Sequence, residues 1–222
     1  GAYDDSYRLV AQGDVRAVAS VRSLPDDREI RSIDCGRRHE IMRFSGDGRF
    51  LAHLDEIGTL RVYRVGDGKP ALDAVPECGG AVAFSPDGRQ LAVGLSGPIV
   101  VFDLETGREH NRWPAHARPY RLAFHPDNRQ LAVGYAEADI ASVYDAADGR
   151  LVADLPIGPT SSQVVAWHPD GKRLAVAGND PRIKIWDVAA RRELATLVGH
   201  VQQVGTLSFH PNGELLVSTS WD

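Results

Sequence analysis

An aromatic residue followed by a tight turn recurs five times along the chain, and this repeat restricts the possible folds more than any other feature. Successive aromatic residues lie 40, 40, 43 and 42 residues apart. The five segments are Phe44-Ser-Gly-Asp-Gly, Phe84-Ser-Pro-Asp-Gly, Phe124-His-Pro-Asp-Asn, Trp167-His-Pro-Asp-Gly and Phe209-His-Pro-Asn-Gly. Repeats of this length predict one supersecondary unit per period, stacked on its neighbours.

Each repeated segment has the residues that a hairpin turn requires. Proline fixes φ at the first turn position in four of the five segments, and Asp or Asn follows it. The last residue of each turn tolerates positive φ, because Gly and Asn enter the left-handed region most readily. These residues are Gly48, Gly88, Asn128, Gly171 and Gly213. We therefore expect two antiparallel strands joined at each turn.

Further strands follow at fixed offsets. A leucine lies seven residues after each aromatic residue, at positions 51, 91, 131, 174 and 216. A third strand then contains a second aromatic residue, and five residues beyond it comes Gly68, Gly107 or Gly149. The fourth repeat has Arg191 at that point, so we expect its turn to differ. Four short antiparallel strands in about 41 residues match one blade of an all-β β-propeller.

The chain resembles the WD40-repeat family most closely at residues 183–200. This stretch contains the pairs Trp186-Asp187 and Gly199-His200, which mark that family. The resemblance implies a polar network of a loop His, a strand Ser or Thr, a turn Asp and the strand Trp. Residues matching parts of it are His200, Ser218 or Ser220 and Asp222 in the last repeat, Asp180 and Trp186 in the fourth, and His116 and Asp139 in the third, where Tyr144 replaces the Trp. Because no repeat has the full set, we expect packing to hold most blades together.

We expect one β-propeller over residues 1–222. Four complete blades are predicted at about 39–79, 80–118, 119–161 and 162–201. Partial blades are predicted at 1–38, lacking its first strand, and at 202–222, with strands one and two. We interpret the chain as a piece of a longer, bacterial-type protein. Its missing strands would come from the rest of that protein or from a second copy.

Composition excludes several classes of function. The net charge of −5, from 25 basic and 30 acidic residues, argues against nucleic acid as a partner. No apolar run is long enough to span a bilayer, and no signal peptide opens the chain. Only Cys35 and Cys78 are present, at similar places in consecutive repeats. We favour reduced, partly buried thiols over a bridge between them, and a cytoplasmic location.

No constellation of residues predicts a metal, a cofactor or catalysis. His125, His168 and His210 occupy one turn position in successive repeats, too far apart to bind a single ion, and are expected at the surface. The predicted innermost strands, at 41–44, 81–84, 121–124, 164–167 and 206–209, contain no carboxylate or histidine. The carboxylate pairs 26–27 and 55–56 lie in predicted turns and are expected to be solvated.

The strongest candidates for a contact patch lie near the loop that opens the third complete blade. Exposed aromatic residues and arginines are the usual anchors of protein interfaces. His116, Arg118, Tyr120 and Trp113 fit this description, although local loop packing explains them equally well.

The family resemblance implies a non-catalytic scaffold that binds proteins or peptides. One alternative is a sensor or docking module fused to a bacterial signalling enzyme such as a serine/threonine kinase, whose motifs would lie outside this sequence. A second is a propeller hydrolase or lactonase, which would need acids or a metal on the inner strands.

Overall fold

The computed structural model describes residues 2–4, 8–14, 17–24, 26–158 and 162–222, and every regular element in them is a β-strand. The chain divides into two compact units. Unit 1 comprises residues 1–80, 84–91 and 102–110, and unit 2 comprises 81–83, 92–101 and 111–222. The described residues include no helix that could cross a membrane.

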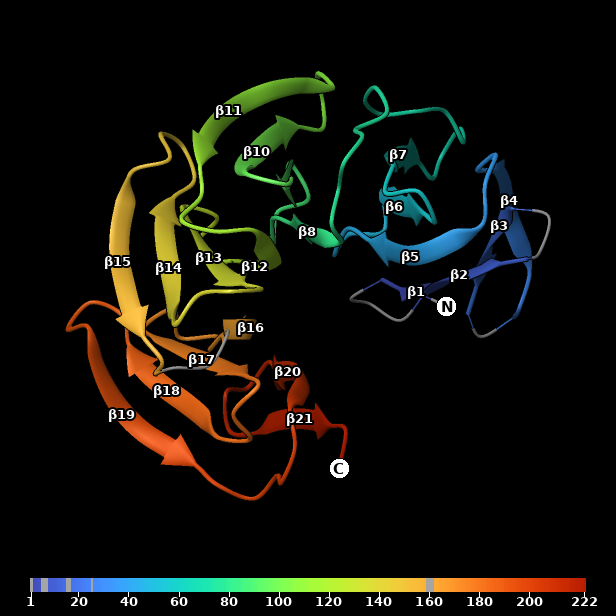
Figure 1. Ribbon diagram of the computed structural model, residues 1–222. Coiled ribbons are helices and arrows are strands. Elements are labelled where there is room, and N and C mark those ends of the chain that lie inside the picture. The colour runs from blue at the N-terminus through green and yellow to red at the C-terminus, as the bar shows by residue number, and fades with distance from the viewer. Residues whose placement is uncertain (1, 5–7, 15–16, 25, 159–161) are drawn as a thin grey trace. The chain divides into compact units, whose positions relative to one another are not determined.

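Unit 1 contains two antiparallel sheets (Figure 1). The first has the order β1-β2-β3-β4, with β1 Ala2–Tyr3, β2 Leu9–Gly13, β3 Val18–Ser23 and β4 Glu29–Asp34. The second has the order β5-β6-β7, with β5 His39–Phe44, β6 Phe50–Asp55 and β7 Leu60–Arg64. A core cluster that includes Val21, Ile33, Phe44 and Leu51 packs the two sheets together.

Two predictions about these sheets were wrong. The first sheet has four strands, because the two-residue β1 pairs with β2 at Tyr3↔Val10. The second sheet has only three, and single bridges at Leu60↔Val75 and Tyr63↔Pro70 replace its fourth strand. Proline lacks the N–H group that a continuous ladder needs, so a prolyl residue at the start of this segment prevents a regular strand.

A four-stranded sheet with the order β11-β10-β9-β8 has residues in both units. Its strands are β8 Ala81–Phe84, β9 Gln90–Gly94, β10 Pro98–Asp103 and β11 Arg108–Pro114. It corresponds to the predicted repeat at 80–118, with all four strands present.

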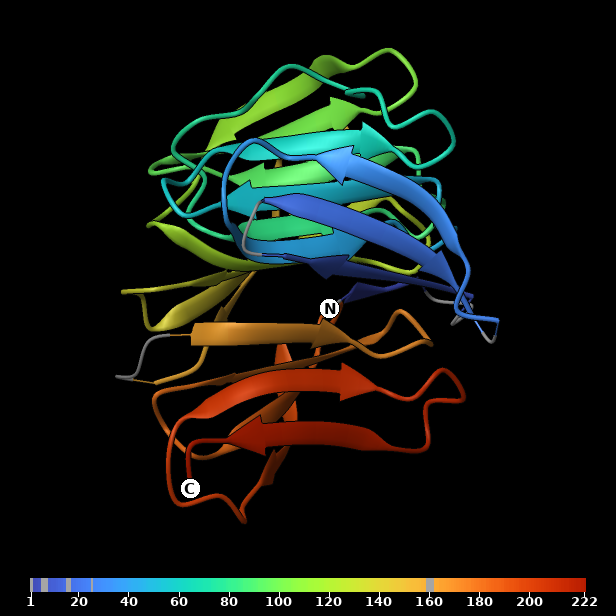
Figure 2. The same ribbon diagram turned by 90° about the vertical axis from the view of Figure 1, so that its right-hand side faces the viewer.

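Unit 2 contains two further four-stranded sheets and one hairpin. The first sheet has β12 Pro119–Phe124, β13 Gln130–Tyr135, β14 Ile140–Asp145 and β15 Leu151–Pro156 in sequence order. The second has β16 Ser162–Trp167, β17 Arg173–Gly178, β18 Ile183–Asp187 and β19 Arg192–Leu197. The antiparallel hairpin β20 Val204–Phe209 and β21 Leu216–Ser220 follows (Figure 2). This all-β arrangement of repeated antiparallel sheets is that of β-propeller blades, as predicted.

The repeated hydrophobic positions form the contacts between successive sheets of unit 2. The leucines at 131 and 174 are completely buried, and so are the alanines that follow them. One core cluster joins Val143 and Leu155 of the sheet β12–β15 to Trp167 and Trp186 of the next sheet. The first strands also meet, since β16 contacts both β12 and β20. Packing of apolar residues therefore joins the blades of this unit, in agreement with the expectation from the incomplete polar networks.

The turn conformations follow the sequence prediction closely. All five residues at the last turn position have positive φ, from 67° at Gly88 and Asn128 to 77° at Gly213. Gly68, Gly107 and Gly149 have positive φ as well. Arg191 takes the same left-handed region at φ 50°, but its N–H donates to the carbonyl three residues back at 3.3 Å, whereas Gly149 donates four residues back at 2.9 Å. The fourth turn thus differs in hydrogen bonding and retains a strained backbone.

Candidate protein-interaction surfaces

Two of the turn histidines connect adjacent sheets of unit 2. The Nε2 atom of His125 lies 2.7 Å from the carbonyl oxygen of Gly171, and Nε2 of His168 lies 2.9 Å from that of Gly213. The two imidazole rings also pack edge-on against Trp167 and Phe209, at centroid distances of 4.6 and 4.9 Å. Our expectation of surface histidines was wrong for these two positions, because the stacking of the sheets brings each ring against the next turn.

The third turn histidine, His210, is exposed, in agreement with the prediction. Its Nδ1 atom lies 2.7 Å from the side-chain oxygen of Asn212 within the same turn. In the described part of the chain, no group of three or more His, Cys, Asp or Glu side chains could hold a metal ion.

Serine occupies the same turn position in the two earlier repeats and makes local bonds instead. The hydroxyl of Ser45 donates to Asp47 at 2.7 Å and accepts from the N–H of Phe50 at 3.0 Å. Ser85 makes the equivalent bonds to Asp87 and Gln90. Since the serine side chain is shorter than the imidazole, these bonds stay within one hairpin.

The predicted contact patch surrounds the loop between β11 and β12. His116 and Arg118 are exposed, whereas Tyr120 is half-buried under the guanidinium of Arg121, which lies 4.7 Å from its ring centroid. Trp113 is only 5% exposed and packs 5.9 Å from the ring of Tyr144. Trp113 therefore packs in the core beside the loop. The side chains of His116, Arg118 and Tyr120 are accessible to a partner.

A partly buried polar cluster lies at the base of this patch. The hydroxyl of Ser142 donates to Asp154 at 2.6 Å, and the other carboxylate oxygen lies 3.4 Å from His116 Nε2. Below them the hydroxyl groups of Tyr135 and Tyr144 are 2.9 Å apart, and burial raises the pKa of Tyr135. The family resemblance implies that His116 and Asp139 belong to one network. In the structure His116 instead lies against Asp154, a residue of β15 that is directly opposite Ser142 of β14.

This cluster does not have the order of a hydrolytic triad. Nucleophilic catalysis by serine requires a base that takes the hydroxyl proton and is itself oriented by a third group. Here Asp154 lies between Ser142 and His116, and Ser142 is completely buried. The arrangement positions the imidazole at the surface and does not activate a nucleophile.

The residues that carry the family resemblance are partly brought together. His200 lies 2.8 Å from Ser218 Oγ through Nε2 and 3.3 Å from Asp222 through Nδ1, while Ser220 donates to the backbone of residue 202. Gly199, just before this histidine, has open space around its α-carbon.

The fourth repeat is different. Asp180 pairs with Arg182, and Asp187 accepts the N–H of Ala190 at 2.9 Å. Nε1 of Trp186 has no hydrogen-bond partner among the described residues.

Two expectations about carboxylates need correction. Asp55 is completely buried and accepts hydrogen bonds from the N–H groups of Ile57 and Thr59 and from Arg61. Against the opposing effect of burial, these donors lower its pKa. Strand β5 also begins two residues earlier than predicted and includes His39 and Glu40, so one first strand does contain a histidine and an exposed carboxylate.

The two cysteines are buried free thiols in unit 1. Cys35 is 2% exposed and Cys78 is 4% exposed. Burial raises the pKa of Cys35 to about 11 and raises that of Cys78 as well. Neither thiol has the accessible, acidic character of a reactive cysteine.

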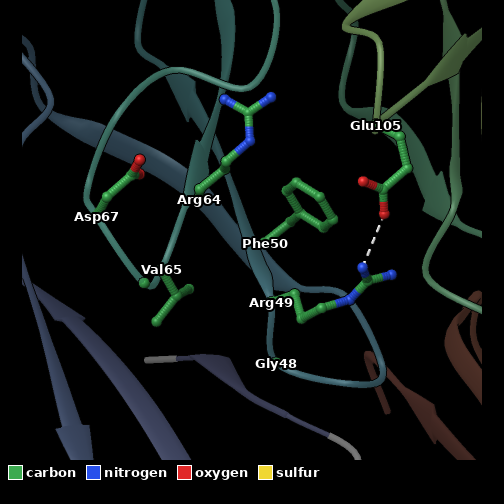
Figure 3. Close-up of a pocket in the computed structure, with 8 residues that line it drawn as sticks. Gly48, Arg49, Phe50, Arg64, Val65, Asp67 and Glu105 are labelled. Carbon is green, nitrogen blue, oxygen red and sulfur yellow. Dashed lines mark hydrogen bonds and ion pairs between the residues drawn. The ribbon is translucent and has the colours of Figure 1, made fainter.

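A cavity of about 530 Å³ opens on unit 1 (Figure 3). It is lined by the β5–β6 turn, the end of β7 and the β10–β11 turn, and its residues include Arg49, Phe50, Arg64, Val65, Asp67 and Glu105. Sequence reasoning did not identify this cavity, because its lining residues come from two different repeats, at 39–79 and 80–118.

Comparison with known proteins supports the repeat assignment. A family model described as WD domain, G-beta repeat matches residues 158–187 and 191–222. The chain is similar to the human U5 small nuclear ribonucleoprotein 40 kDa protein, with 35% identity over 57 residues that make up 26% of this chain and 16% of that protein. It is also 34% identical over 85 residues to the Arabidopsis thaliana protein Cell division cycle 20.1, cofactor of APC complex, covering 36% of this chain and 18% of the relative. A third match, to Coronin-7 of Pongo abelii, has 43% identity over 67 residues, or 26% and 7% of the two chains. The chain therefore aligns with less than a fifth of the length of each of these relatives.

Proposed function

Because the chain is a WD40-repeat protein, we propose that it binds other proteins through loops held on stacked β-sheets, and that it does so without catalysing a reaction. The main observation behind this proposal is the exposed β11–β12 loop, which packs against the polar cluster around Asp154. His116 and Arg118 project from the β11–β12 loop, and the His116 imidazole contacts Asp154 and the rings of the buried tyrosine pair. A side chain fixed before binding loses less conformational entropy when a partner docks.

Two further observations support a binding role. Arginine and tyrosine are enriched among the residues that dominate interface energies, and Tyr120 and Arg121 stack beside the loop. One relative's name describes it as a cofactor of a complex, and another's as a protein of a ribonucleoprotein. Both names describe components of larger assemblies.

The test is a quantitative pull-down from lysate of the source organism with the full chain as bait. The patch variant combines H116A, R118A and Y120A. The control variant combines H210A and R192A, which remove exposed side chains of the same unit elsewhere. We expect a reproducible set of captured proteins that is depleted at least about tenfold by the patch variant, since loss of central contacts costs ~1.4 kcal/mol or more. Equal capture by both variants would refute a role for this loop.

A further inference from the structure

The cavity on unit 1 combines an apolar floor with a charged rim. Phe50 and Val65 form the floor and are 3% and 6% exposed. Gly48 and Gly66 leave the walls beside them without side chains. Figure 3 shows the Phe50 ring in the centre, with Asp67 and Glu105 on opposite sides. An apolar side chain of a ligand that covers this floor would be removed from water.

The two arginines of the cavity differ in their partners. Arg49 is fully engaged, because Nη1 donates to Glu105 at 2.8 Å and Nε bonds Asp47. This pairing ties the β5–β6 turn to the β10–β11 turn and shapes one wall. Arg64 donates from Nη1 to the carbonyl oxygen of Pro70 at 2.9 Å, and the ion pairs of the described residues give it no carboxylate partner.

A third arginine reinforces the positive side of the rim. Arg31 donates from Nη2 to the carbonyl of Gly66, which lies in the cavity wall. On the other side, Asp67 accepts the backbone N–H of Lys69 at 2.9 Å and keeps its charge, and Glu105 pairs with Arg49. Of the two arginines that line the cavity, only Arg64 is therefore without a carboxylate among the ion pairs of the described residues.

We propose that this cavity binds a short acidic peptide segment, in which a glutamate or aspartate carboxylate pairs with Arg64 and an adjacent apolar side chain covers Phe50 and Val65. Arginine favours carboxylates because its planar guanidinium can donate two parallel hydrogen bonds. A basic peptide would place its charge against Arg64, and a purely apolar one would leave the guanidinium without a counter-charge. The cavity residues all belong to unit 1, whereas the β11–β12 loop belongs to unit 2, so this site goes beyond the interaction proposed above and can be tested separately.

The probe is a set of fluorescein-labelled peptides in which glutamate alternates with leucine or phenylalanine, measured by fluorescence anisotropy against the full chain. A matched set replaces every glutamate with glutamine. We expect saturable binding of the acidic set that weakens as salt is raised. The neutral set should bind at least about tenfold more weakly, because glutamine cannot form charge-assisted hydrogen bonds with Arg64.

Two pairs of variants locate the site. R64Q removes the proposed carboxylate partner, and its control R37Q makes the same change at an exposed position outside the cavity. G66L fills the cavity, and its control G97L adds the same side chain elsewhere. Both glycines lack positive φ and have no atom within 4 Å of an added Cβ, so neither change strains the fold.

We expect R64Q and G66L to weaken binding about tenfold or more, and R37Q and G97L to leave it within about twofold. Circular dichroism and thermal unfolding check that each variant is folded. Any one of three results would overturn the proposal. The acidic set could fail to bind the native chain, the neutral set could bind equally well, or each variant could bind as tightly as its control. Because Arg64 and Gly66 belong to unit 1 and the β11–β12 loop belongs to unit 2, the pull-down result does not depend on this outcome.

Discussion

Replacing His168 by alanine should destabilise unit 2 far more than the same replacement at His210. The two residues occupy the same turn position, but His168 is 5% exposed and bonded to the next turn, whereas His210 is exposed. H168A removes the 2.9 Å contact with Gly213 and the edge-on packing against Phe209. It also leaves the carbonyl of Gly213 and the N–H of Asp170 without their partner.

The expected loss follows from these contacts. An unmade hydrogen bond to a buried group costs ~1–3 kcal/mol, and an aromatic edge contact contributes ~0.5–1.5 kcal/mol. The sum is about 1.5–4.5 kcal/mol for H168A, against less than ~0.5 kcal/mol for H210A at an exposed site. For a chain of this size each kcal/mol lowers Tm by about 2–4 °C, so H168A should lower it by about 3–18 °C.

The assay is urea and thermal unfolding of the full chain, followed by intrinsic tryptophan fluorescence, because Trp167 and Trp186 report on this part of unit 2. H168S is an informative third variant, since serine makes only local bonds at this position in Ser45 and Ser85. It should fall between the native chain and H168A. If H168A and H210A shift the unfolding midpoint equally, the contact between turns contributes nothing and the reasoning fails.

Three further outcomes are expected. R191G should stabilise the chain by about 1 kcal/mol in urea unfolding, because it relieves a left-handed φ of 50° in a residue with a Cβ. The control N128G should change stability by less than ~0.5 kcal/mol. A destabilised R191G would show that the hydrogen bond from Arg191 to the Val152 carbonyl outweighs the strain. Asp170 has a pKa of about 2, since the opposing effect of burial is outweighed by hydrogen bonds from Lys172, Arg173 and His168. Because this folded pKa is below the unfolded value of about 3.9, Asp170 stabilises the fold above that value, and the stabilisation is lost as pH falls towards 2. The Tm of D170N should therefore fall less steeply between pH 5 and pH 2 than that of the native chain. Native Cys35, with its pKa of about 11, should react with a thiol reagent at pH 8 much more slowly than in urea, and equal rates would contradict its burial.

The local conformations could be predicted from the sequence, because they depend on residues close together in the chain. Positive φ at Gly48, Asn128 and Gly171 follows from the need of each turn for a residue that tolerates the left-handed region. The leucine seven residues after each aromatic residue pairs with it across the turn, as in Phe124↔Leu131. Four of the five leucines are completely buried, and Leu216 is partly buried.

Contacts between repeats could not be predicted in the same way. Whether a turn histidine faces solvent or the next sheet depends on how the sheets stack, and no local pattern distinguishes His168 from His210. The pairing of His116 with Asp154 depends on the position of β15 beside β14, and the short β1 has too few residues to give a periodic signal. The cavity on unit 1 was missed because its walls come from separate repeats.

The linked turns of unit 2 give each repeat a polarity. In the repeat at 162–201 the turn donates through His168 on one side and accepts through the Gly171 carbonyl on the other. Such an interface is heterologous: the two contacting surfaces differ, and one copy carries both halves. A tandem duplication of this single repeat would therefore place a donor opposite an acceptor at the new junction, and the chain could gain a blade without any change in its turn sequences.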